Sequence, residues 1–172
     1  NGGFAVENAA VSEAQLPLYV CEVEGETKYV LPLYGAGLWG PIWGYVALNA
    51  DKESIYGVYF SHSGETPGLG AEITNRDKFQ VPFIGKKALD ADGNVVISVV
   101  KNGKVQNPDT EVDGISGGTI TSQGVDAMLK SGIGLYKAFL AKKCEQACCV
   151  AACDSTACAA EVPADVIEVV NQ

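Results

Sequence analysis

The segment GYVALNADKESIYGVYFSHS, residues 44–63, indicates the fold class of this chain. Its two halves, 44–50 and 54–63, are rich in β-branched and aromatic residues, and a polar Asp-Lys-Glu turn separates them. This pattern predicts two neighbouring strands of an antiparallel hairpin. Further along, VVISVVKNGKV at 95–105 contains the strong turn signal Asn-Gly, so a second hairpin is predicted there.

Two helices are predicted beside these strands. From Ser122 to about Lys143 apolar residues recur at helical spacing, which is typical of a long amphipathic helix. Thr121 or Ser122 would cap its N-terminus, and residues 71–79 would form a shorter helix. Together these elements predict one α+β domain, with helices packed on a twisted, mostly antiparallel sheet.

The composition is that of a folded domain. Of 172 residues, 47% are hydrophobic and 19% are charged, which is ordinary for a globular protein and too apolar for disorder. The net charge of −9, with 12 basic residues against 21 acidic ones, argues against a nucleic-acid partner. No apolar run approaches the roughly 18 residues of a membrane helix, so the chain as given should be soluble.

Two glycine-rich segments are candidates for binding. GETPGLG at 64–70 has three Gly and one Pro in seven residues, which predicts a tight loop that brings backbone close to a neighbour. DGISGGTITS at 113–122 places three Gly and four hydroxyl side chains before the long helix, a pattern that suits a phosphate at the helix N-terminus. An ordinary capped helix start gives the same pattern, so the residues alone leave both interpretations open.

The second segment also matches a known attachment motif. Asp113, Ser116, Gly117 and Thr119 fit the pattern D-x-x-[ST]-G-A-T, at which bacterial flavin transferases attach FMN. Gly118 stands where Ala is usual, which is a change between two small residues. The resemblance implies that Thr119 carries FMN through its phosphate, that Asp113 marks the site for the transferase and its metal, and that Ser116 helps to define the turn.

Two further stretches extend the resemblance. LYGAGLWGPIWGY at 33–45 and HSGETPGLGAEI at 62–73, together with the attachment motif, resemble the C subunits of the sodium-translocating NADH:quinone oxidoreductases. The G subunits of the Rnf complexes share the ETPGLG and attachment motifs, whereas the stretch at 33–45 looks more like the quinone reductase. A flavin-free binding domain of the same fold is the other alternative.

This resemblance implies an electron-transfer subunit with covalent FMN, inactive alone and working within a membrane redox complex. It would be anchored in the bacterial inner membrane by an N-terminal helix that is absent here, with its domain facing the periplasm. Electrons from NADH would reach this FMN through other subunits and continue to quinone, while sodium moves elsewhere in the complex. The partners would be those subunits and, during maturation, the flavin transferase.

The expected flavin contacts come from three segments. In the 64–70 loop, Leu69 would pack on the ring face, and Thr66 and backbone N–H groups would reach its polar edge. Trp39 would lie beside the site, whereas Trp43 would belong to the core. The lone His62 is interpreted as structural, and neither catalytic residues nor metal ligands are predicted. The complete set of predicted FMN contacts is Trp39, Glu65, Thr66, Gly68, Leu69, Gly70, Asp113, Ser116, Gly117, Gly118, Thr119 and Thr121.

The rest of the chain divides around this domain. Residues 1–30 are predicted to be a lead-in and first element, 31–143 the FMN-binding domain, and 144–172 a Cys- and Ala-rich extension. Five of the six cysteines lie in that extension, without the C-x2-C spacing of a zinc ribbon or a nearby His. Disulfides are favoured over a metal site if the domain is exported. A secreted Cys-rich interaction protein would explain this extension and nothing else.

Overall fold

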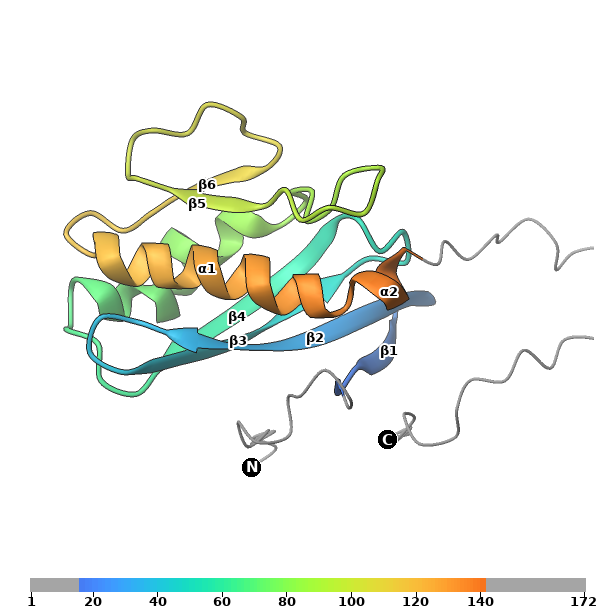
Figure 1. Ribbon diagram of the computed structural model, residues 1–172, viewed down its shortest axis with the longest axis horizontal. Helices are drawn as coiled ribbons and strands as arrows, with labels where there is room; N and C mark the ends of the chain where they lie inside the picture. The colour runs from blue at the N-terminus through green and yellow to red at the C-terminus, as the bar shows by residue number, and fades with distance from the viewer. Residues whose placement is uncertain (1–15, 142–172) are drawn as a thin grey trace, which may run out of the picture.

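The main sheet has four antiparallel strands in the order β1-β2-β3-β4 (Figure 1). The computed structural model describes residues 16–141. The strands are β1 (Tyr19–Val23), β2 (Glu26–Ala36), β3 (Pro41–Leu48) and β4 (Ile55–His62). The pairing of β3 with β4 confirms the first predicted hairpin, and β2 runs across the predicted boundary between residues 30 and 31.

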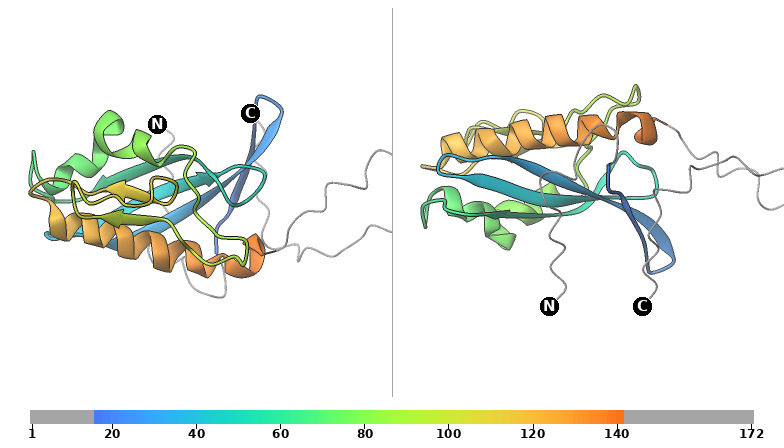
Figure 2. Two further views of the ribbon diagram at one scale, coloured as in Figure 1. Left: turned by 90° about the horizontal axis from the view of Figure 1, so that it is seen from above. Right: turned by 60° about the horizontal axis from the view of Figure 1, so that its bottom comes forward.

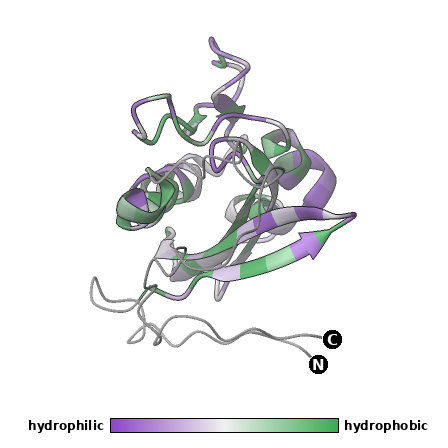
Figure 3. Cartoon of the chain, turned by 90° about the vertical axis from the view of Figure 1, so that its right-hand side faces the viewer, coloured by the Kyte–Doolittle hydropathy of each residue, from purple (hydrophilic) through white to green (hydrophobic). Residues whose placement is uncertain are grey.

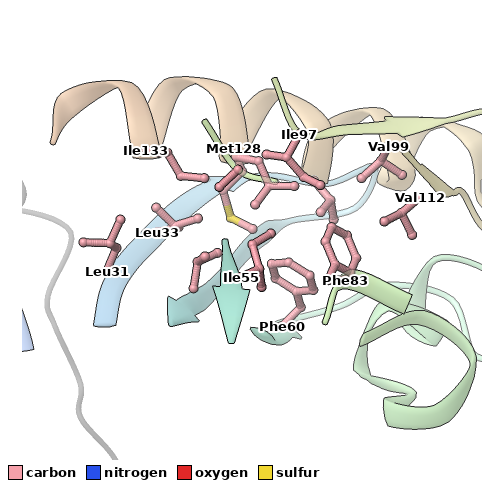
Figure 4. Close-up of a cluster of buried hydrophobic side chains, with 14 of the residues drawn as sticks. Leu31, Leu33, Ile55, Phe60, Phe83, Ile97, Val99, Val112, Met128 and Ile133 are labelled. Carbon is pink, nitrogen blue, oxygen red and sulfur yellow. The ribbon is translucent and has the colours of Figure 1, made fainter. Parts of the chain in front are cut away.

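Helix α1 (Thr119–Leu135) lies across one face of this sheet and is followed by the short α2 (Lys137–Leu140) (Figures 1 and 2). In Figure 4, Met128 and Ile133 of α1 point toward Leu33 of β2. All three are buried in the core. The helix begins three residues before the predicted start and breaks at Tyr136, and residues 142 and 143 lie outside the described range.

The second predicted hairpin is wrong. The turn at Asn102-Gly103 does form, since Lys104 N–H donates to the Lys101 carbonyl at 2.9 Å. The chain after it does not return along the same strand. Instead β5 (Ser98–Val100) pairs in parallel with β6 (Glu111–Asp113). The Glu111 carboxylate accepts the backbone N–H groups of residues 106 and 107, so those groups are not available to a returning strand.

The predicted helix at 71–79 is divided into short turns. A 3-10 helix η2 (Gly70–Thr74) and a π-helical turn η3 (Arg76–Gln80) are separated by Asn75, whose backbone is extended and whose side chain accepts Lys78 N–H at 3.2 Å. A last 3-10 turn, η4 (Val81–Phe83), follows. These turns pack beside β4, where an aromatic cluster forms from Phe60, Phe79 and Phe83.

The outer surface of the sheet differs from one further expectation. Trp43 is half-buried, because its neighbours Ile42 and Gly44 on β3 face the core and alternate residues of a strand point to opposite faces. The prediction that Trp43 belongs to the core is therefore wrong.

The edge strand β1 mixes hydrophobic and hydrophilic residues, and its central residues are exposed (Figure 3). Within residues 16–141, the structure has no helix that is both long and apolar enough to cross a membrane.

Candidate functional site

Thr119 is the first residue of α1, and it is exposed to solvent. Gly118 occupies the N-cap position and offers no side-chain cap. The prediction that Thr121 or Ser122 caps this helix is therefore wrong, because both residues are buried within the first turn. An uncapped helix start presents N–H groups and the positive end of the helix dipole, so it favours an anion.

The buried hydroxyl of Ser122 holds the turn that precedes Thr119. It accepts the Ile115 N–H at 2.9 Å and donates to the Gly118 carbonyl at 2.8 Å. Gly118 N–H in turn donates to the Ile115 carbonyl at 3.0 Å. Gly117 has φ of +77°, which side chains rarely tolerate. This turn therefore has one defined conformation, and sequence reasoning missed the part that Ser122 plays in it.

The 64–70 loop packs directly against that turn. A Cβ atom on Gly117 would lie 2.6 Å from Leu69 Cδ2, and one on Gly118 would lie 3.3 Å from the Gly70 nitrogen. The loop is closed by the N–H of Leu69, which donates to the Thr66 carbonyl at 3.1 Å. Leu69 itself is 42% exposed. The close backbone approach predicted for this loop is thus made to the turn before α1.

Glu65 connects the three segments that carry the sequence resemblance. Its side chain is buried, with 5% of the residue exposed. One carboxylate oxygen accepts Trp39 N–H at 2.8 Å, and the other accepts the Thr121 hydroxyl at 2.5 Å. Glu65 N–H donates to His62 Nδ1 at 3.1 Å, which gives His62 a structural contact. Glu65 and Thr121 therefore lie beneath the loops and are bonded to each other.

Trp39 lies on the β2–β3 loop at the same end of the molecule as the start of α1 (Figure 1). It is 67% exposed, and the neighbouring Leu38 is 46% exposed. The loop is anchored to α1 at its base, because a Cβ on Gly124 would collide with the Ala36 carbonyl. Only the backbone of Trp39 is fixed by Glu65, so its indole is left at the surface.

Asp113, at the end of β6, contacts the turn at residues 102–103. Its carboxylate accepts Gly103 N–H at 2.7 Å, and Asn102 donates to the Gly114 carbonyl at 3.1 Å. These hydrogen bonds tie the 102–103 turn to the start of the attachment segment.

A cavity of about 100 Å³ opens beside Thr119. A larger one of about 380 Å³ is lined by Gly68, Glu72, Lys78, Phe79, Asn102 and residues 113–116.

Comparison with protein families identifies the domain. The model of the family described as FMN-binding domain matches residues 37–134. The chain belongs to the FMN-binding domain family. The matched range contains all of the predicted contact residues from Trp39 to Thr121.

Individual proteins are similar to this chain over a longer stretch. The C subunit of the Na(+)-translocating NADH-quinone reductase of Haemophilus ducreyi is 40% identical over 132 residues, which are 73% of this chain and 50% of that protein. Its counterpart of the same name in Pseudomonas aeruginosa is 37% identical over 136 residues, 75% of this chain and 51% of that protein. The chain thus spans about half the length of these relatives, and the predicted resemblance to the C subunits is confirmed.

Two solved structures share the fold. The structure of the C subunit of the Na(+)-translocating NADH-quinone reductase from Parabacteroides distasonis is 52% identical, with a TM-score of 0.67 over 72% of this chain and 61% of that one. The Shewanella oneidensis NqrC structure is 35% identical, with a TM-score of 0.60 over 66% of this chain and 52% of that one. These likenesses confirm the predicted α+β fold.

Within the described part of this FMN-binding domain, no group of three or more His, Cys, Asp or Glu residues could hold a metal ion. Cys21 is exposed and has a free thiol. The five cysteines of the predicted extension at 144–172 lie outside the described residues, and their disulfides remain a prediction.

Proposed function

We propose that this chain is the redox domain of the C subunit of a sodium-translocating NADH-quinone reductase, and that it carries FMN as a phosphoester on Thr119. The observation that carries the proposal is the position of Thr119. It is an exposed hydroxyl residue at the uncapped start of α1, inside a flavin-attachment motif. The names of the relatives favour this function over that of the G subunit of an Rnf complex.

The residues around Thr119 fit FMN. The phosphate would lie at the helix start beside Gly117, because no side chain caps the first N–H groups of α1. Ser116 and Gly68 line the larger cavity, which has room for part of a flavin ring. Leu69 would offer an apolar surface to the ring, and Thr66 a polar one. When bound, FMN would supply the one- and two-electron chemistry, and the chain would supply position and electrostatics.

Five further predicted contacts take supporting places in this proposal. Glu65, Gly70 and Thr121 would act from beneath the loops, since Glu65 and Thr121 are bonded to each other. Asp113 would serve recognition by the flavin transferase, because it lies at the exposed edge of the motif. Trp39 would stand at the rim of the site.

The whole protein would act only within its complex. Electrons that originate from NADH would enter and leave through neighbouring subunits, on the path to quinone. The domain would face the periplasm, held at the bacterial inner membrane by a helix outside this sequence. The other subunits and the flavin transferase are the partners in this proposal.

Intact mass tests the proposal. The chain is exported together with an active flavin transferase, and the wild type is compared with Thr119→Ala and with Ser131→Ala, a control on the exposed side of α1. We expect the wild type and the Ser131 variant to gain roughly 438 Da, FMN minus water, and the Thr119 variant to gain nothing. A wild type that gains no mass, while a control substrate is labelled, would refute covalent attachment.

A further inference from the structure

The buried carboxylate of Glu65 has a structural position that the proposed function does not explain. A carboxylate in the interior is costly unless hydrogen bonds compensate for the lost water. Two ion pairs within residues 16–141 join other side chains, Lys28 with Glu26 and Lys130 with Asp126. Glu65 is instead held by the Trp39 N–H and the Thr121 hydroxyl.

The glycines around Glu65 leave space for this carboxylate. A Cβ atom on Gly37 would collide with one carboxylate oxygen, and a Cβ on Gly70 would collide with the other and with the Thr121 hydroxyl. Gly37 belongs to the β2–β3 loop, and Gly70 ends the 64–70 loop. Two separate loops therefore lack side chains where they meet the same buried group.

We propose that Glu65 is a positioning residue, which joins the Trp39 loop and the first turn of α1 in the arrangement that flavin attachment requires. One oxygen fixes the backbone of Trp39. The other fixes Thr121, two residues after Thr119 on the same helical turn. The effect on flavin rests on the proposed function, whereas the bond to Trp39 is a property of the protein itself.

Three variants test the two contacts of the Glu65 carboxylate. Glu65→Gln keeps an oxygen that can accept the Trp39 N–H. Its amide nitrogen can donate to the Thr121 hydroxyl, because a hydroxyl oxygen also accepts hydrogen bonds. Glu65→Ala removes both contacts. Thr121→Val is the matched control, because it removes one donor, retains the side-chain shape and leaves the Trp39 contact in place.

The first measurement uses the protein before flavin attachment. Amide hydrogen exchange at Trp39 should become at least about tenfold faster in Glu65→Ala, and stay near the wild-type rate in Glu65→Gln and Thr121→Val. If Glu65→Ala does not fold, the comparison rests on Glu65→Gln, whose Trp39 amide must stay protected. Unchanged exchange in a folded Glu65→Ala, or lost protection in Glu65→Gln, overturns the proposal.

The second measurement uses the flavin-loaded protein. Under matched co-expression, the fraction carrying FMN should fall severalfold in Glu65→Ala and recover in Glu65→Gln, and the midpoint potential of the attached flavin should shift only in the alanine variant. Equal loading and equal potential in a folded Glu65→Ala would overturn the positioning role. If the wild type takes no flavin, the proposed function fails, and the Trp39 exchange measurement still decides the structural part.

Discussion

Replacing Ser122 by alanine tests how the turn before Thr119 is held. The Ser122 hydroxyl is buried and accepts the Ile115 N–H at 2.9 Å. Its other partner, the Gly118 carbonyl, still accepts the backbone N–H of residue 122 at 2.9 Å after the change. The variant therefore leaves one donor without a partner, at a cost of about 1–3 kcal/mol. At about 4 °C per kcal/mol for a domain of this size, Tm should fall by roughly 4–12 °C.

Ser131→Ala is the matched control, because Ser131 is also on α1 and its hydroxyl also bonds a carbonyl four residues earlier, at 2.7 Å. It is exposed, so its loss should change stability by no more than about 0.5 kcal/mol. Urea unfolding and thermal melts of both variants, with exchange at the Ile115 amide, give the comparison. Equal stability of the two variants, or a protected Ile115 amide in Ser122→Ala, would refute this reasoning.

Two further predictions concern packing and pH. Gly124→Ala should destabilise the domain by more than about 1 kcal/mol in urea unfolding, because its Cβ would strike the Ala36 carbonyl. Gly134→Ala should instead stabilise α1 by about 0.5–1 kcal/mol, because a Cβ at that position meets no other atom within 4 Å. A Gly124→Ala variant more stable than the wild type would contradict this packing. Burial raises the pKa of Tyr136 to about 12. The contribution of this neutral phenol to the free energy of unfolding is therefore complete below pH 10 and is lost as pH rises through 12. Between those values the wild type should lose stability more steeply than Tyr136→Phe, and equal slopes would rule this out.

The parts of the fold that follow from local pattern were predicted from the sequence. The 44–63 hairpin is rich in β-branched and aromatic residues around a polar turn, and α1 has a regular apolar stripe, so each signal lies within one segment. The 95–105 segment shows where such reasoning fails. Its Asn-Gly turn forms, but the Glu111 carboxylate accepts the backbone N–H groups of residues 106 and 107. The sequence of the turn does not contain the information for that contact.

The candidate site shows the same division between local and long-range information. The motif around Thr119 is continuous in the chain, so its position at a helix start was predictable. The place of Glu65 was not, because its partners Trp39 and Thr121 are 26 and 56 residues away in sequence. A Glu beside a Thr in a glycine-rich loop is typical of a ligand-binding loop. Only the fold shows that both carboxylate oxygens of Glu65 already accept hydrogen bonds from within the protein.

The uncapped start of α1 connects stability to the proposed function. A Ser or Asn at the N-cap would be favoured for stability alone, since such side chains bond the first N–H groups of a helix. Those are the groups that a phosphate on Thr119 would need. The chain has Gly118 at the cap and places the stabilising hydroxyl at Ser122, where it holds the turn from inside and leaves the helix start without a side-chain cap. The turn is therefore supported from beneath, and its outer side stays open for an anion.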